Sequence, residues 1–150
     1  MNPFAGILST SSSFGPFLLR VGLAIVFFPH GAQNTLGWFG GGGLAGSTGF
    51  LHQSLHIPMV LAQVAMWTEL LAPVFLFLGL FTRPAAFALG TTMAVAGILV
   101  HPRYGFFMNW YGTQAGEGFE FHILAVAGCL CLLFTGAGAL SLDRRISGGE

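Results

Sequence analysis

The sequence predicts an all-α, polytopic membrane protein built as a bundle of four transmembrane helices. Only 7% of its 150 residues are charged and 54% are apolar, whereas an ordinary soluble domain is roughly 25% charged. The mean hydropathy is +0.77. A soluble domain of this length needs more charge to cover its surface, so these values favour a membrane protein. The formal net charge of zero, with no basic stripe, also excludes nucleic acid as a partner.

Four apolar stretches are long enough to cross a lipid bilayer, which takes about 20 residues. They run over residues 16–36, 58–81, 84–101 and 118–140. Proline lies at or near the start of the first three, where its missing N–H costs a helix nothing. Since lipid offers no partner to open backbone groups, we expect each stretch to be a helix. No internal repeat is visible, which predicts a single membrane domain over residues 1–150.

The arginines predict the orientation of this domain. Four of the five lie toward one side of the predicted bundle: Arg20, Arg83, Arg144 and Arg145. Arg103 lies toward the other side. By the positive-inside rule we expect a multi-pass protein of a bacterial-type inner membrane with both termini in the cytoplasm. Residues 1–15 contain no basic residue, so we interpret them as a short tail and not as a cleaved signal peptide.

The two longer connections then lie on the outer side, as loops over residues 37–57 and 102–117. Both carry large aromatic side chains: Trp38, Phe106, Phe107, Trp110 and Tyr111. Amphipathic rings prefer the membrane interface, and aromatic clusters also suit protein contacts. These residues are therefore candidates for docking to other membrane protein subunits.

Ionisable residues inside membrane spans are costly and are functional candidates by default. Here they are Arg20, His30, Glu69, His101, Glu120 and His122. At a rise of about 1.5 Å per residue, all except Arg20 fall near the middle or in the outer half of the bundle. We therefore expect one polar pocket that opens toward the outer loops.

Glu69 is the costliest of these groups, because a carboxylate at mid-membrane needs a partner or a proton. His30 has a matching depth, and Arg20 lies about 12 Å away along the membrane normal, just within reach of two long side chains. Gln33 and Asn34 share a helix face with His30. The candidates for ligand or proton handling are thus His30, Gln33, Asn34, Glu69, His101 and Glu120. The structural alternative is a buried polar pair that holds two helices together.

Spacing along the last two spans predicts which faces point inward. Gly90, Ala94, Gly97 and His101 form a seam of small residues that ends in a histidine, which is typical of close helix packing. On a regular helix His122 lies about 200° from Glu120. We therefore expect His122 to face a neighbour, a partner subunit or the interface, unless the helix begins later than residue 118.

The cysteines and histidines do not predict a disulfide or a metal site. Cys129 and Cys131 are two residues apart on a predicted helix and point to opposite sides, so they cannot bridge. The spans contain no metal-ligand spacing. His52 and His56 have a suitable spacing only if their segment is helical. We expect no metal and no intrinsic cofactor, with a bound quinone as the one candidate ligand.

Several ordered motifs resemble the DoxX family of four-helix integral membrane proteins. They lie at residues 19–22, 30–33, 37–41, 69–71, 78–83, 105–110, 116–122 and 136–143. The likeness covers about residues 16–145. One departure is Asn34, where the family usually has a lysine, so a charge-based role at this position does not carry over.

The resemblance implies a four-helix fold and a link to redox chemistry, since relatives include the membrane part of thiosulfate:quinone oxidoreductase. Two functions follow. One is a quinone-linked redox module, or a redox-associated subunit, whose polar pocket holds a quinone head group. The alternative is a non-catalytic accessory or assembly subunit that docks to a larger membrane complex through its outer loops. A transporter fits poorly, because the four short spans contain no repeat.

Overall fold

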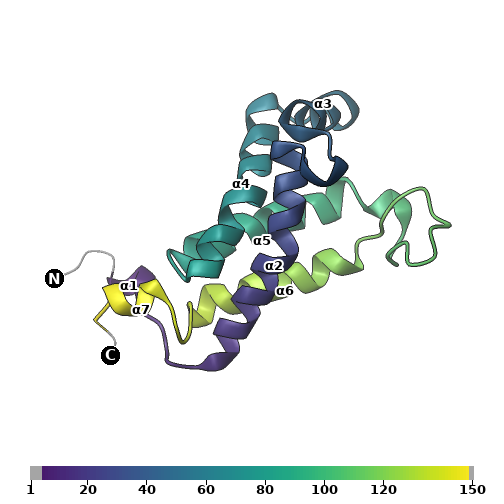
Figure 1. Ribbon diagram of the computed structural model, residues 1–150. Coiled ribbons are helices and arrows are strands. Elements are labelled where there is room, and N and C mark those ends of the chain that lie inside the picture. Colours follow the sequence, from purple (N-terminus) through teal and green to yellow (C-terminus); the bar gives the residue numbers. More distant parts are fainter. Residues whose placement is uncertain (1–4, 149–150) are drawn as a thin grey trace.

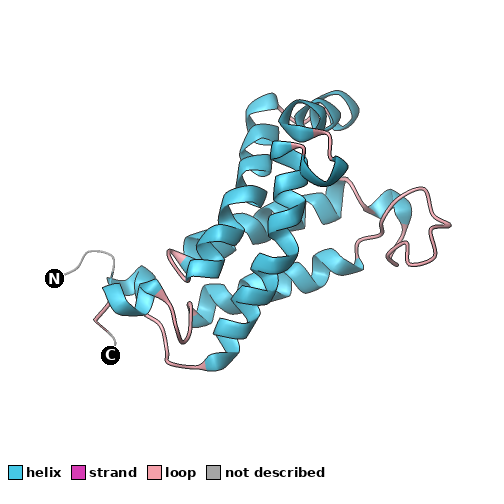
Figure 2. Cartoon of the chain, in the orientation of Figure 1, coloured by secondary structure: helices cyan, strands magenta, loops and turns pink. Residues whose placement is uncertain are grey.

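The structure is a computed structural model, and it describes residues 5–148. The described chain is all-α, with no strand among these residues (Figure 2). In chain order the elements are α1 (Ala5–Leu8), α2 (Phe14–Leu36), η1 (Trp38–Gly40), α3 (Gly43–Leu55), α4 (Met59–Leu78), α5 (Thr82–Leu99), η2 (Pro102–Tyr104), α6 (Glu120–Thr135) and α7 (Leu142–Ile146).

The four long helices pack mainly as two pairs, α2 with α4 and α5 with α6, and the pairs meet where α4 contacts α5. Figure 1 shows the α2–α4 pair leading to α3 and the α5–α6 pair leading to the loop before α6. We call the end of the bundle that carries α3 and this loop the loop end. Helices α1 and α7 contact each other at the opposite end, which we call the terminal end.

Each predicted span contains one long helix, with shifted ends. Helices α2 and α4 are long and apolar enough to cross a membrane, whereas α6 is apolar but has only 16 residues. The prediction that the last helix continues to residue 140 is wrong. The helix ends at Thr135 because Gly136 and Gly138 adopt φ angles of 77° and 72°, a left-handed conformation that breaks the helix.

The connection over residues 37–57 is also more ordered than a loop. It contains α3, which packs against both α2 and α4. The sequence does not indicate this helix, because five of the seven residues 40–46 are glycines, and glycine has a low helix propensity. Tertiary contacts with α2 and α4 outweigh that preference.

Small residues set the distances between the long helices. A methyl group added to Gly31 on α2 would lie 2.2 Å from the backbone oxygen of Glu69 on α4, so only glycine permits this approach. On α5, Gly90 and Gly97 lie against the side chains of Cys129 and His122. The predicted small-residue seam of α5 therefore faces α6, as expected for tightly packed membrane helices.

The terminal end is held together by arginines and an aspartate. Arg20 is fully buried and donates hydrogen bonds to the carbonyl oxygens of Leu76, Phe77, Ala137, Ala139 and Leu140. Arg20 therefore does not pair with Glu69, a pairing that the sequence left open, because its guanidinium bonds the end of α4 and the chain after α6. Asp143 accepts hydrogen bonds from the amides of Phe81 and Thr82 at the start of α5.

Candidate functional site

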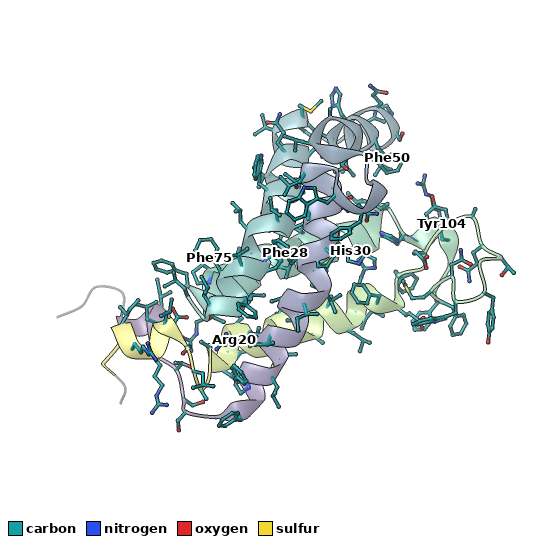
Figure 3. The ribbon with its side chains drawn as sticks, in the orientation of Figure 1. Arg20, Phe28, His30, Phe50, Phe75 and Tyr104 are labelled. Atoms are coloured by element: carbon teal, nitrogen blue, oxygen red, sulfur yellow. The ribbon has the colours of Figure 1, made fainter. Side chains whose placement is uncertain are left out.

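A cavity of about 330 Å³ lies between α2, α4, α5, α6 and the loop before α6. We call it the polar cavity. Its polar lining consists of His30, Asn34, Glu69, His101, Glu117 and His122. Its apolar lining consists of Phe27, Met93, Ala96, Met108 and Phe121. Figure 3 shows His30 on the side of α2 that faces the α5–α6 pair. Four of the six predicted ligand-handling residues thus lie around one cavity.

Glu69 is fixed to α2 by side-chain and backbone contacts. Its Oε2 accepts a hydrogen bond of 2.8 Å from Nδ2 of Asn34, and Glu69 is only 7% exposed. One turn away, the hydroxyl of Thr35 donates to the backbone oxygen of Met66. Because Gly31 lets the two backbones touch, the carboxylate is held where α2 and α4 are closest. The partner of Glu69 is therefore a neutral amide, and not Arg20.

Two histidines from different helices stack at the loop end. The ring centroids of His101, just after α5, and His122 on α6 are 4.1 Å apart. Nδ1 of His101 lies 2.7 Å from the carbonyl oxygen of Glu117. Since a carbonyl only accepts, this nitrogen carries the proton, and Nε2 of a neutral His101 ring is an acceptor. Nδ1 of His122 is buried and has no hydrogen-bond partner among residues 5–148.

The prediction that His122 faces a partner or the interface is corrected by this arrangement. Helix α6 begins at Glu120, two residues later than expected, and its first turn directs His122 toward Gly97 and His101. His122 is 8% exposed and lines the polar cavity. Glu120 and His122 lie on opposite sides of α6, as their spacing requires, but the buried face is the one that carries His122, Ala125, Cys129 and Leu132.

Glu120 does not line the polar cavity, contrary to expectation. Its Oε1 accepts hydrogen bonds from the amide of Met108 and from the indole Nε1 of Trp110, at 2.8 and 3.2 Å. Glu120 thus fastens the connection over residues 102–117, which we call the aromatic loop, to the start of α6. Glu117 lines the cavity instead, while its Oε2 accepts from the amide of Asn109. Nothing in the sequence favours Glu117, because it precedes the helix and lies between two glycines.

Gln33 is also outside the cavity. A methyl group added to Gly41 would lie 2.1 Å from the backbone oxygen of Gln33 and 2.3 Å from its Cγ. Gln33 therefore packs against the glycine-rich turn that leads into α3. Gln33 and His30 lie on neighbouring parts of one face of α2. The glycine-rich turn covers the part that carries Gln33.

The predicted docking residues of the two outer connections are exposed. Trp38 is 52% exposed, Phe107 67%, Trp110 78% and Tyr111 91%. Phe106 is less exposed because it packs edge-on against Phe107 and Phe119. These rings are available to a membrane interface or to a partner. The loop that carries all of them except Trp38 is ordered by Glu117 and Glu120.

Metal ligands are not clustered in the part of the chain that the structure describes, where no group of three His, Cys, Asp or Glu residues could hold a metal ion. His52 does lie on a helix, but its Nδ1 is 2.9 Å from the carbonyl oxygen of Ile57. Cys129 is buried and Cys131 is exposed, and neither is in a disulfide.

Comparison with known proteins identifies the family. The DoxX family profile matches residues 15–102. This chain belongs to the DoxX family. Together with the two long apolar helices, the match makes it a DoxX membrane protein. The matched region covers α2 to α5 and includes Asn34 and Glu69, whereas His122 lies beyond it.

Three relatives of this DoxX protein have similar sequences. An uncharacterized protein of Haemophilus influenzae is 34% identical over 140 residues, covering 85% of this chain and 87% of the relative. A second uncharacterized protein of that organism is 34% identical over 84 residues, covering 56% of this chain and 52% of the relative. "Putative oxidoreductase CatD" of Bacillus subtilis is 30% identical over 143 residues, covering 95% of each chain. No solved structure matches the chain significantly.

Proposed function

We propose that this DoxX protein is a four-span protein of a bacterial-type inner membrane, with both termini in the cytoplasm, and that its polar cavity binds the head group of a quinone. The observation that carries the proposal is the polar cavity itself, which gathers Glu69, His101 and His122 from three helices. Buried ionisable groups of this kind inside membrane helices are expensive and are retained where they do chemistry.

The lining fits a quinone head group in size and chemistry. A volume of about 330 Å³ is at the lower end of the range of ligand pockets and suits a single ring. Phe27, Met93 and Phe121 supply apolar walls for the ring. Asn34 and His30 supply hydrogen-bond donors for its carbonyl oxygens. Nδ1 of His122, which lacks a partner among the described residues, leaves one more polar group to be satisfied.

A bound quinone would supply the redox chemistry, and the chain's own residues would move protons. Nε2 of His101 is free to accept a proton, because Nδ1 is engaged by the carbonyl oxygen of Glu117. Glu69 offers a carboxylate within the same cavity. The sequence contains no nucleotide-binding or iron–sulfur motif, so the electrons would come from a partner subunit. The name of the Bacillus subtilis relative supports a redox role.

Thermal unfolding of the detergent-solubilised protein tests this proposal. A soluble quinone analogue should raise the melting temperature of the wild type in a concentration-dependent way, since ligands that bind only the folded state stabilise it. Glu69→Gln and His122→Gln should each weaken binding by about tenfold or more, which corresponds to loss of one hydrogen bond to a charged or buried group. His52→Gln is the matched control, because His52 is outside the polar cavity. A wild type without any shift would reject the proposal.

A second candidate function is an accessory subunit that docks through its aromatic loop. It is favoured by the exposure of Trp110 and Tyr111, at 78% and 91%, on a loop that is otherwise tied down by hydrogen bonds. Exposed aromatic residues on an ordered loop are typical of interaction hot spots. Purification in mild detergent should recover a defined partner with the wild type, and Trp110→Ser with Tyr111→Ser should lose it. A protein that always elutes alone would count against this function.

A further inference from the structure

A second, larger cavity adjoins the polar cavity at the loop end. It has a volume of about 490 Å³ and runs between α3, α4 and α5. We call it the apolar groove. Its walls include Leu51 and Leu55 of α3, Leu61 of α4, and Val95 and Leu99 of α5. Helix α3, which the sequence did not predict, is therefore one wall of this groove.

The groove is almost free of available polar groups. The hydroxyls of Thr91 and Thr92 donate to the carbonyl oxygens of Phe87 and Ala88 in their own helix, so they are already satisfied. The ionisable side chains in its lining are His56, at the connection after α3, and Glu69. An apolar chain therefore suits the groove better than a polar ligand does.

Glu69 and Ala96 line both the apolar groove and the polar cavity. The two spaces therefore border the same carboxylate from two directions. Only Oε2 of Glu69 is hydrogen-bonded by Asn34, and no partner for Oε1 occurs within residues 5–148. Ala96, the other residue that lines both spaces, has only a methyl side chain.

We propose that the apolar groove holds the apolar tail of an amphiphile whose polar head lies in the polar cavity beside Glu69. This rests on the proposed function, and it makes the ligand a long-tailed, membrane-soluble quinone. The ligand would enter from the lipid phase between α4 and α5, with its tail against α3. The groove thus selects for the tail, whereas Glu69, Asn34 and the histidines select for the head.

The experiment compares two probes on the solubilised protein, a ring-only benzoquinone and the same ring with a decyl tail. The wild type should bind the decyl compound at least tenfold more tightly, because burial of apolar groups adds affinity. Val95→Trp fills the groove from α5 and should abolish this gain while changing binding of the ring-only compound by less than about twofold, since Val95 is outside the polar cavity.

Val74→Trp is the matched control. Val74 and Val95 are 40% and 44% exposed, and Val74 lines neither cavity, so the tail gain should be intact in this variant. Equal binding of the two probes by the wild type would overturn the tail groove alone. A tail gain that survives in Val95→Trp would also overturn it, because the tail would then lie in the detergent or lipid. No binding of either probe would overturn the proposed function as well.

Discussion

Among the residues that the structure describes, Arg20 is the largest side chain that is completely buried, although it lies in an apolar segment of α2. Its guanidinium reaches five carbonyl oxygens from two segments far apart in the sequence, the end of α4 and residues 137–140. Leu76 and Phe77 lie in the last turn of α4, where carbonyls lack the usual i+4 donor, and residues 137–140 follow the end of α6. Arg20 therefore caps the end of α4 and ties it to the segment after α6. The last carbonyls of α6 are bonded instead by Arg83.

Arg20→Lys should destabilise the protein by at least about 2 kcal/mol, because one ammonium cannot satisfy five oxygens and buried carbonyls are left without partners. A lower melting temperature in detergent would measure this effect. Arg145→Lys is the control, since Arg145 is exposed on α7 and should change stability by less than about 0.5 kcal/mol. Equal melting temperatures for the two variants would contradict the capping role.

The hydrogen bond between Asn34 and Glu69 can be tested by a double-mutant cycle. Asn34→Ala and Glu69→Ala should show a coupling energy of about 0.5–3 kcal/mol, because each substitution leaves the other side chain without its buried partner. Unfolding in detergent measures all four proteins. A cycle of Asn34→Ala with Thr135→Ala should be additive within about 0.5 kcal/mol. The hydroxyl of Thr135 bonds the carbonyl oxygen of Cys131, at the end of α6 that is far from the polar cavity. Additivity in both cycles would show that the pair does not interact.

Helix packing depends on where glycine allows backbones to approach. At Gly31, α2 touches the backbone of α4 beside Glu69, so this one contact sets both the packing of the pair and the position of the carboxylate. At Gly97, α5 leaves room for the side chain of His122. The polar cavity is thus framed by two close approaches, of which the one at Gly31 excludes any larger residue.

Gly31→Ala should therefore destabilise the protein by about 1–3 kcal/mol, as for other overpacked interior positions, and should weaken ligand binding at the polar cavity. Gly22→Ala is the matched control on the same helix, because a methyl group there has no atom within 4 Å. It should stabilise the helix by about 0.5–1 kcal/mol, the usual difference between glycine and alanine. Thermal unfolding compares them, and a neutral Gly31→Ala would contradict the tight α2–α4 contact.

At the scale of the molecule, α3 and the aromatic loop lie at one end and α1 and α7 at the other (Figure 1). Helices α1 and α7 thus lie at the same end, as the proposed orientation requires of the two termini. Arg20 and Arg83 both bond carbonyl groups near the terminal end, so two of the arginines used to predict the orientation also have structural roles.

Cysteine accessibility tests the orientation. In a background with Cys129→Ala and Cys131→Ala, a cysteine introduced by Thr113→Cys should react with a membrane-impermeant reagent in intact cells. One introduced by Ser147→Cys should react only after the membrane is permeabilised. Labelling of both sites in intact cells, or the reverse pattern, would contradict cytoplasmic termini. Permeabilised cells provide the control, because both residues lie at least partly exposed.

Composition and apolar periodicity by themselves determined the all-α class, the four long helices and the short list of costly polar residues, because these depend on local length and hydropathy. Four of the six ligand candidates lie on the polar cavity for the same reason, since their depths could be counted along each helix. The α5 seam that faces α6 also followed from spacing alone.

Only the tertiary structure decided the remaining features, because they depend on where helices begin and end and on contacts between distant segments. Packing of α6 against α5 directs His122 into the polar cavity, and Glu120, on the opposite side of α6, bonds the aromatic loop. Arg20 donates its hydrogen bonds to the carbonyl oxygens that follow α6, so Glu69 is bonded by Asn34 instead. Helix α3 formed despite its glycines because α2 and α4 provide its packing surface, and it created the apolar groove.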